Sequence, residues 1–229
     1  MVGLVSLVKR KIICGGTIIS QDYFLTTAHC FVDEIYNDAT KIAALVGDHD
    51  VTVGTESIYS TLYTISKIIK HQDYNPSSNI QENDIALVKM AKPFVFNKGV
   101  GASCLPWKFT ADYFDNKFIL AAGYGMLNFG GDQSAKLQKV SLQILPANRC
   151  EDSIFNPNKV CSYGVNKDTC TSDSGAALYF VQARQYAIGL VSYGRACGTS
   201  TPSVNTRITS YLEWIQINTH DQRDQFCRK

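Results

Sequence analysis

The sequence predicts a mainly β protein with two β-rich halves and one helix near its C-terminus. Short runs rich in Ile, Val, Thr and Tyr are separated by Gly, Asn, Asp or Pro turn signals. In residues 207–218, by contrast, Ile208, Leu212 and Ile215 fall at helical spacing. Pro and Gly interrupt residues 91–107 near the middle of the chain. We therefore expect two small barrels or sandwiches packed together, with any active site in the crevice between them.

The predicted strands follow from these runs in chain order. They span residues 14–20, 24–27, 42–46, 59–69, 85–90, 117–122, 137–144, 176–181 and 186–192. Each run is short enough for a strand and is bounded by residues that favour turns.

Length and composition exclude several classes of protein. A chain of 229 residues, 45% of them hydrophobic, can bury a substantial core in one large or two small domains. The formal net charge is only +2 and charged residues make up 18%. Nucleic acid and acidic membrane surfaces are therefore not expected as partners. No apolar run reaches the roughly 18 residues that a membrane-spanning helix needs.

The eight cysteines indicate disulfides, because none of them forms a Cys-x-x-Cys pair. Disulfides persist outside the cytosol, so we expect a secreted, extracellular protein. The short apolar stretch at residues 1–8 precedes Lys9, Arg10 and Lys11, which is the reverse of the order in a signal peptide. We therefore expect that a targeting segment preceded Met1 and that the chain is a processed or truncated piece.

Three local strings contain the residue types of nucleophilic catalysis. They are CGGTIISQDYFLTTAHC with His29, NDIALV with Asp84, and CTSDSGAAL with Ser174. Alone, each string more often has a structural role. A histidine next to a buried cysteine is usually structural, an aspartate before a strand usually caps or turns the chain, and an Asp-Ser-Gly triplet is usually a turn. Together, in the order His, Asp, Ser and with these flanking residues, they resemble the chymotrypsin/trypsin family of serine proteases.

That resemblance implies an all-β fold of two packed, six-stranded antiparallel β-barrels with a C-terminal α-helix. The N-terminal barrel would occupy residues 1–101 and carry His29 and Asp84. The C-terminal barrel would occupy residues 102–229 and carry Ser174, a helix at about 207–218 and a polar C-terminal extension.

The resemblance also implies a role for each residue of the triad. Ser174 would be the nucleophile, and His29 would take its proton, because a serine hydroxyl is too weak an acid to attack an amide unaided. Asp84 would orient His29 and stabilise the imidazolium. The backbone N–H groups of Ser172 and Ser174 would form the oxyanion hole, and Asp173 would pair with the α-amino group of an activated N-terminus.

Substrate specificity would depend on a second group of positions. Asp168 stands where trypsin-like members carry the carboxylate at the base of the primary pocket, which implies cleavage after Arg or Lys. Ser192 and Gly194 match the pocket-wall segment that binds the substrate backbone as an added strand. Ser203 replaces a usual pocket-wall glycine, so its hydroxymethyl group would narrow the pocket.

Two further departures bear on activity. Ser172 replaces a glycine of the usual GDSGGP string, and loss of one oxyanion donor typically costs about 10²–10³ in turnover. The family's activated start, which resembles IVGG, would lie upstream of Met1. The chain as given would then not activate, Asp173 would lack its cation, and the structure would resemble a zymogen.

The resemblance implies three disulfides, Cys14–Cys30, Cys150–Cys161 and Cys170–Cys197. Cys104 and Cys227 remain. Either they bond each other, or Cys104 once held an N-terminal segment and Cys227 is free or intermolecular.

No metal or other cofactor is expected. Asp48, Asp50 and Glu56 lie in a loop that binds calcium in some family members, but their irregular spacing favours a solvated loop. The histidines other than His29 are scattered, without the spacing of a metal cluster.

Two functions fit the sequence. The first is a secreted, monomeric serine endopeptidase that is made as a zymogen and cleaves protein or peptide substrates after Arg or Lys. Its partners would be an activating protease and protein protease inhibitors. The second is a catalytically weak or inactive homologue that acts by binding proteins. Retention of all three triad residues favours the enzyme.

Overall fold

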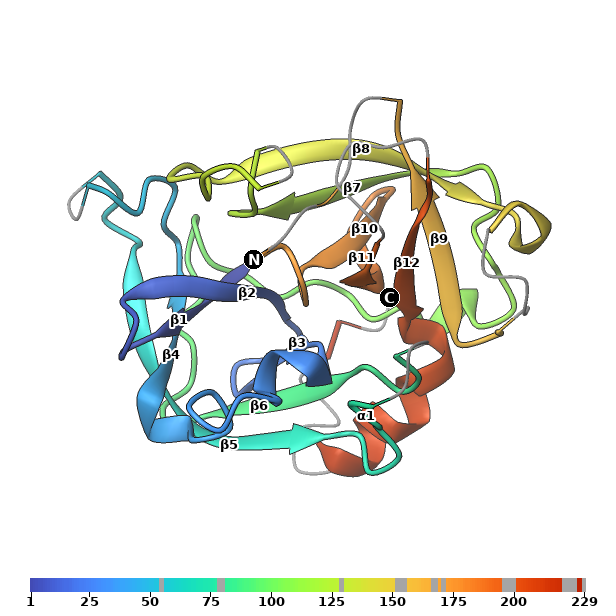
Figure 1. Cartoon of the computed structure of the whole chain (residues 1–229). Helices are drawn as coiled ribbons and strands as arrows, with labels where there is room; N and C mark the ends of the chain where they lie inside the picture. The colour runs from blue at the N-terminus through green and yellow to red at the C-terminus, as the bar shows by residue number, and fades with distance from the viewer. Residues whose placement is uncertain are drawn as a thin grey trace.

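Two closed β-barrels lie side by side, and the C-terminal helix packs beside the first of them (Figure 1). This computed structural model describes residues 1–53, 56–77, 81–127, 130–150, 156–165, 169, 172–194, 201–219 and 226–227. All strand pairs within the two barrels are antiparallel. The predicted fold class is therefore confirmed. Among the described residues, no helix is long and apolar enough to cross a membrane.

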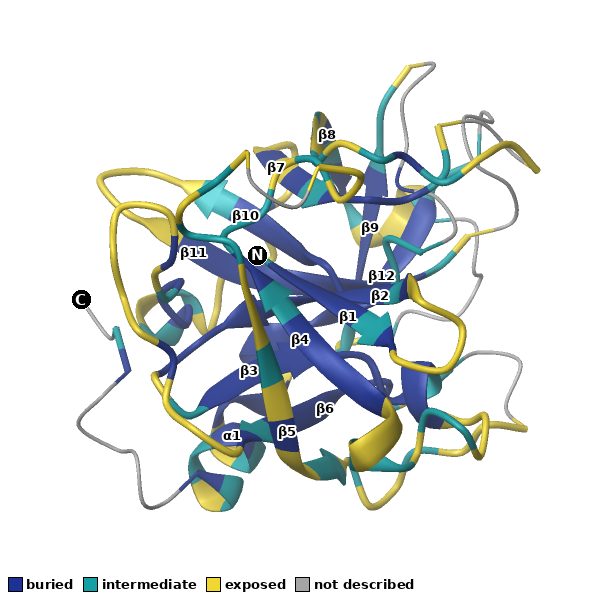
Figure 2. Ribbon diagram, turned by 90° about the vertical axis from the view of Figure 1, so that its left-hand side faces the viewer, coloured by how far each residue is buried: buried dark blue, intermediate teal, exposed yellow. Residues whose placement is uncertain are grey.

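The first barrel closes in the strand order β1-β2-β3-β6-β5-β4. Its strands are β1 (Val2–Ser6), β2 (Lys11–Ile18), β3 (Tyr23–Thr26), β4 (Ile42–Val46), β5 (Thr61–Lys70) and β6 (Ala86–Met90). Leu4, Phe24 and Val88 are fully buried in its interior. Figure 2 shows exposed residues along β5, on the outside of this barrel. Closure leaves no free strand edge.

The second barrel closes in the order β10-β11-β12-β9-β8-β7. Its strands are β7 (Phe118–Gly123), β8 (Gln138–Leu145), β9 (Lys159–Tyr163), β10 (Ala177–Val181), β11 (Gln185–Tyr193) and β12 (Ser203–Arg207). Its core includes Leu142, Leu178 and Ile188. The predicted boundary at residue 101 lies between β6 and β7 and stays a prediction.

A separate apolar cluster joins the two barrels. Leu25 and Leu87 from the first barrel meet Leu190 of β11 and Ile208 and Ile215 near the C-terminus, all fully buried. Burial of apolar surface at this seam fixes one barrel against the other. Residues on opposite sides of the seam can therefore form one site.

The helix begins later than predicted. Helix α1 spans Leu212–Asn218 and follows a 3-10 turn at Ile208–Tyr211. Arg207 belongs to β12, where it pairs with Gly189, and its guanidinium donates to the carbonyl oxygens of Thr110, Asp112 and Pro157. These partners hold Arg207 in the sheet.

Disulfides join Cys14 to Cys30, Cys150 to Cys161 and Cys104 to Cys227. The first of the two alternatives for Cys104 is therefore the one that the structure adopts. The backbone N–H of Leu105 also donates to the carbonyl of Cys227, and Phe226 is buried in the seam. The predicted Cys170–Cys197 pair lies outside the described residues.

Candidate active site

His29 lies on a short 3-10 turn, Ala28–Phe31, directly after β3. The two residues that follow His29 fasten this turn. Cys30 is bonded to Cys14 of β2, and the ring of Phe31 is fully buried in the first barrel. The His29 side chain itself is 26% exposed. A rigid turn thus presents the imidazole at the junction of the barrels.

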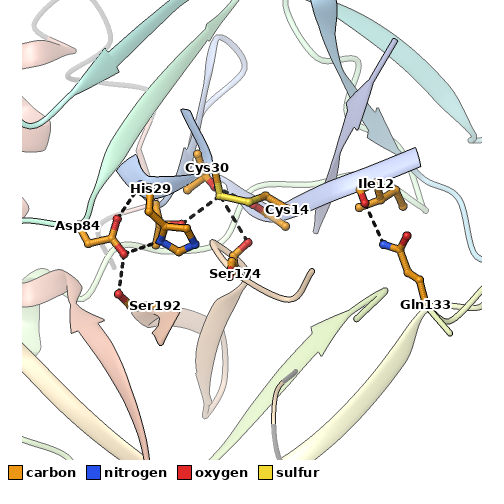
Figure 3. The surroundings of a disulfide bond; sticks show 11 residues. Ile12, Cys14, His29, Cys30, Asp84, Gln133, Ser174 and Ser192 are labelled. Carbon is orange, nitrogen blue, oxygen red and sulfur yellow. Dashed lines mark hydrogen bonds and ion pairs between the residues drawn. A yellow bond between two sulfur atoms is a disulfide. The ribbon is translucent and has the colours of Figure 1, made fainter. Parts of the chain in front are cut away.

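Asp84 lies just before β6 and its side chain is fully buried. One carboxylate oxygen, Oδ2, is 2.8 Å from Nδ1 of His29, and Oδ1 accepts the backbone N–H of His29 at 2.9 Å. The structure therefore brings together two side chains that are 55 positions apart in the sequence. Figure 3 shows the imidazole lying between Asp84 and Ser174.

Two hydroxyl groups from the second barrel also hold Asp84. Ser192 of β11 donates from Oγ to Asp84 Oδ2 at 2.5 Å (Figure 3). Thr206 of β12 donates from Oγ1 to the Asp84 backbone carbonyl at 2.9 Å. Neither contact was predicted from the sequence, because no local motif links these residues to Asp84. The second barrel thus supplies hydrogen bonds to an aspartate of the first barrel.

The pKa of Asp84 lies below its ordinary value. Burial alone raises the pKa, but hydrogen bonds from His29 and Ser192 and the attraction of a charged His29 outweigh burial. Asp84 therefore stays ionised at neutral pH. An ionised acceptor at Nδ1 places the proton of a neutral imidazole there and leaves Nε2 as a base.

Ser174 lies on a turn that precedes β10 and touches both barrels. Its carbonyl accepts the N–H of Gly15 from β2 at 2.7 Å, and the next N–H, from Gly175, donates to Val191 of β11 at 2.8 Å. Gly175 has a φ of +81°, and a Cβ there would overlap the hydroxyl of Thr26. Among the described residues, no hydrogen bond joins the Ser174 hydroxyl to His29. Such contacts often tighten only when substrate binds.

Ser172 and Asp173 complete this turn. Ser172 has a φ of +74°, in the left-handed region that favours glycine. This φ explains why the family's usual residue at this position is glycine. Asp173 accepts the N–H of Gly125 on Oδ1 at 2.8 Å. Its carboxylate faces a cavity of about 130 Å³ that Thr169 and Val140 also line.

The positions predicted for substrate specificity are described only in part. Asp168 lies outside the described residues. Ser203 is buried at the start of β12, and a Cβ on the exposed Gly194 would lie 3.0 Å from its hydroxyl oxygen. Ser203 and Gly194 are therefore neighbours, as a shared pocket wall requires. Ser192 lies two positions before Gly194 in the sequence but directs its hydroxyl at Asp84.

Two groups have the residue types of a metal site. Ligand atoms of Cys14, His29 and Cys30 lie within 4.8 Å of one another. The two sulfur atoms form a disulfide, however, and cannot act as thiolate ligands. In the acidic loop, Glu56 Oε1 accepts the N–H groups of His49 and Asp50. The Glu56 carboxylate therefore already accepts two backbone hydrogen bonds.

Comparison with known proteins gives a family and several relatives for this two-barrel chain. The trypsin family model matches residues 2–215. The chain is 37% identical over 234 residues to "Venom serine protease 34" of Apis mellifera, covering 99% of this chain and 56% of that protein. It is 34% identical over 209 residues to "Venom serine protease" of Polistes dominula, covering 88% and 74%. It is 29% identical over 215 residues to "Trypsin-1" of Astacus astacus, covering 90% and 87%.

The chain belongs to the trypsin family of serine proteases. It spans little more than half the length of the Apis mellifera relative, since 56% of that protein is covered.

Proposed function

We propose that this chain is the catalytic part of a secreted serine endopeptidase, made as a zymogen, that cleaves after Arg or Lys through Ser174, His29 and Asp84. The observation that carries the proposal is the contact between His29 and Asp84. A fully buried carboxylate has a histidine ring nitrogen 2.8 Å away, and the imidazole lies between that carboxylate and Ser174 (Figure 3).

In the proposed reaction, Nε2 of His29 takes the proton of the Ser174 hydroxyl as Oγ bonds to the substrate carbonyl carbon. The carbonyl oxygen becomes an oxyanion, which the N–H groups of Ser172 and Ser174 stabilise. His29 then gives its proton to the leaving amine as the C–N bond breaks. Water, deprotonated by His29, attacks the acyl-enzyme and restores Ser174.

Asp84 would act on His29 without exchanging the proton itself. Its lowered pKa keeps it ionised while the imidazole becomes an imidazolium. The interaction between the two charges is strong because the carboxylate is excluded from water. The backbone contact from His29 to Oδ1 fixes the direction in which the ring can turn.

Specificity for Arg or Lys rests on the sequence position of Asp168, six residues before Ser174. A carboxylate at the base of a pocket would pair with a guanidinium or ammonium group. The neighbouring Ser203 and Gly194 support a pocket wall that the Ser203 side chain narrows.

Activation would use the cavity at Asp173. A new α-amino group that entered this cavity of about 130 Å³ would meet the Asp173 carboxylate. The relatives include "Phenoloxidase-activating factor 3" of Holotrichia diomphalia, at 34% identity. That name supports a protein that activates another one. We further propose an extracellular location, an activating protease and protein inhibitors as partners, and a monomer as the working form.

A second candidate is a catalytically weak or inactive homologue that binds proteins. It is favoured by a single observation, the serine at position 172 with a φ of +74°. Strain at this residue would disturb one donor of the oxyanion hole.

The test uses the complete, processed protein and its Ser174→Ala variant. An irreversible fluorophosphonate reagent should label the former and leave the latter unlabelled. Peptides ending in Arg or Lys should be cleaved much faster than peptides ending in Phe. Absence of labelling in a folded, correctly processed protein would support the second candidate. Preference for Phe would refute the role of Asp168 alone.

A further inference from the structure

We propose that Tyr124 is a positioning residue for the catalytic turn at 172–175, acting through the segment 123–125 and the Asp173 carboxylate. Through its phenol, the segment of the first barrel at residues 47–53 would influence the oxyanion hole on the second barrel. The effect on turnover rests on the proposed function, whereas the structural coupling does not.

The first step is the contact of Asp173 with the segment 123–125. Gly125 donates its N–H to Asp173 Oδ1 at 2.8 Å. A Cβ on Gly123 would overlap Oδ1 of Asp173, and a Cβ on Gly125 would overlap both carboxylate oxygens. The carboxylate therefore sits directly against this backbone, and a shift of the segment must move Asp173 or break its hydrogen bond.

The second step is the attachment of that segment to the first barrel. Tyr124 lies between the two glycines and is 2% exposed. Its hydroxyl donates to the backbone carbonyl of Asp48 at 2.7 Å. Asp48 is itself held, because Ser60 donates to its Oδ2 at 2.5 Å. Tyr124 thus fastens the 123–125 segment to the loop after β4.

The third step is a second tie between the same two regions. Val51 donates its N–H to Ala135 at 3.0 Å, and Leu137 donates to His49 at 2.8 Å, as in an antiparallel bridge. Ser134 in turn donates its N–H to the carbonyl of Gly125 at 3.1 Å. Backbone hydrogen bonds therefore connect residues 49–51 of the first barrel, through residues 134–137, to Gly125.

Tyr124 keeps its proton over the working range of such an enzyme. Burial raises the pKa of its phenol, and the negative charges of Asp48, Glu56 and Asp50 raise it further. The phenol therefore remains a donor at mildly alkaline pH, where serine proteases with a neutral histidine base act.

The expected kinetic effect is on the chemical step. Asp173 directly precedes Ser174, so its position sets the directions of the N–H groups at Ser172 and Ser174. Oxyanion donors bind the transition state more strongly than the substrate. Loss of the Tyr124 hydroxyl should therefore lower kcat and leave KM for a small peptide nearly unchanged.

The experiment compares Tyr124→Phe with Tyr179→Phe in the complete, activated protein. Tyr179 is also buried, and its hydroxyl donates to Thr17 at 3.0 Å, in a contact that includes neither Asp173 nor the segment 123–125. Both variants remove a buried phenol hydroxyl, and because the Tyr179 phenol also has a hydrogen bond with Ser103, Tyr179→Phe should lower Tm at least as much as Tyr124→Phe. Only Tyr124→Phe should lower kcat and the rate of fluorophosphonate labelling, by about twofold to tenfold. Equal kinetic effects in the two variants would overturn the proposal.

Hydrogen exchange at the Gly125 amide gives a readout that does not require activity. Protection of this amide should fall in Tyr124→Phe and stay unchanged in Tyr179→Phe. Unchanged protection in both variants would overturn the coupling, even in an active enzyme. If protection is lost in Tyr124→Phe but the wild-type protein shows no fluorophosphonate labelling, the coupling is kept and the proposed function is refuted instead. Should Tyr124→Phe not fold, Ser60→Ala, at the other end of the contact, is measured in the same way.

Discussion

Removal of the Ser192 hydroxyl tests how the second barrel supports Asp84. In Ser192→Ala, the carboxylate loses the donor that lies 2.5 Å from Oδ2 and keeps its two contacts with His29. A hydrogen bond to a buried charged group contributes about 1.5–3 kcal/mol. For a chain of this size, a loss of that magnitude lowers Tm by roughly 3–12 °C at neutral pH.

The pH dependence of this loss gives the sharper test. The pKa of folded Asp84 is depressed, so its contribution to stability is present above the unfolded pKa and is lost as pH falls through the folded pKa. The Tm difference between wild type and Ser192→Ala should therefore be full at pH 7 and shrink below about pH 4. Thermal unfolding of both proteins from pH 7 to pH 3 measures it.

The matched control is Ser162→Ala. Ser162 is fully buried as well, but its hydroxyl accepts from the neutral amide of Asn205 at 3.0 Å. Its loss should cost about 0.5–1.5 kcal/mol at any pH in this range. A Ser192→Ala difference that stays constant or grows on acidification would refute the account of Asp84 as an ionised, hydrogen-bonded group.

Three other substitutions follow from backbone geometry and covalent bonding. Gly175→Ala should lower both Tm and activity, because its φ is +81° and its new methyl would overlap the Thr26 hydroxyl; unchanged unfolding would contradict that contact. Ser172→Gly should increase the free energy of unfolding by about 1 kcal/mol and should raise kcat, because glycine adopts the φ of +74° at this position without strain; a lower kcat would argue against backbone strain at residue 172. Cys227→Ser should destabilise the protein by about 2–5 kcal/mol in denaturant unfolding, through loss of the bond to Cys104; an unchanged midpoint would show that this bond contributes little.

Local sequence was sufficient to predict most strands but not β1, β9 and β12. In β12, Asn205 is of a residue type that strands disfavour, yet Asn205 and its polar neighbour Thr206 are fully buried. The amide nitrogen of Asn205 donates to Ser162, and Thr206 donates to the carbonyl of Asp84. Distant residues thus satisfy the Thr206 hydroxyl and the Asn205 amide nitrogen on burial. These partners could not be predicted from a local pattern.

The candidate site was likewise predictable from the sequence only in part. The strings around His29 and Asp84 contain two residues whose side chains meet in the structure, and the catalytic roles of His29, Asp84 and Ser174 stay predictions. The role of Ser192 was not predicted, because it depends on a contact across 108 positions between two barrels. Tyr124 likewise carries no motif, and only the folded chain shows that its hydroxyl reaches Asp48.

The dependence of Asp84 on Ser192 and Thr206 has a consequence during synthesis. The first barrel leaves the ribosome first, carrying His29 and Asp84, but the hydroxyls that complete the carboxylate and the proposed nucleophile come from the last third of the chain. A nascent chain in which only the first barrel has folded therefore lacks the hydroxyls that hold Asp84 and the proposed nucleophile. Proteolytic activity would arise only after the two barrels dock, so the first barrel alone would not cleave other proteins in the cell that makes this chain.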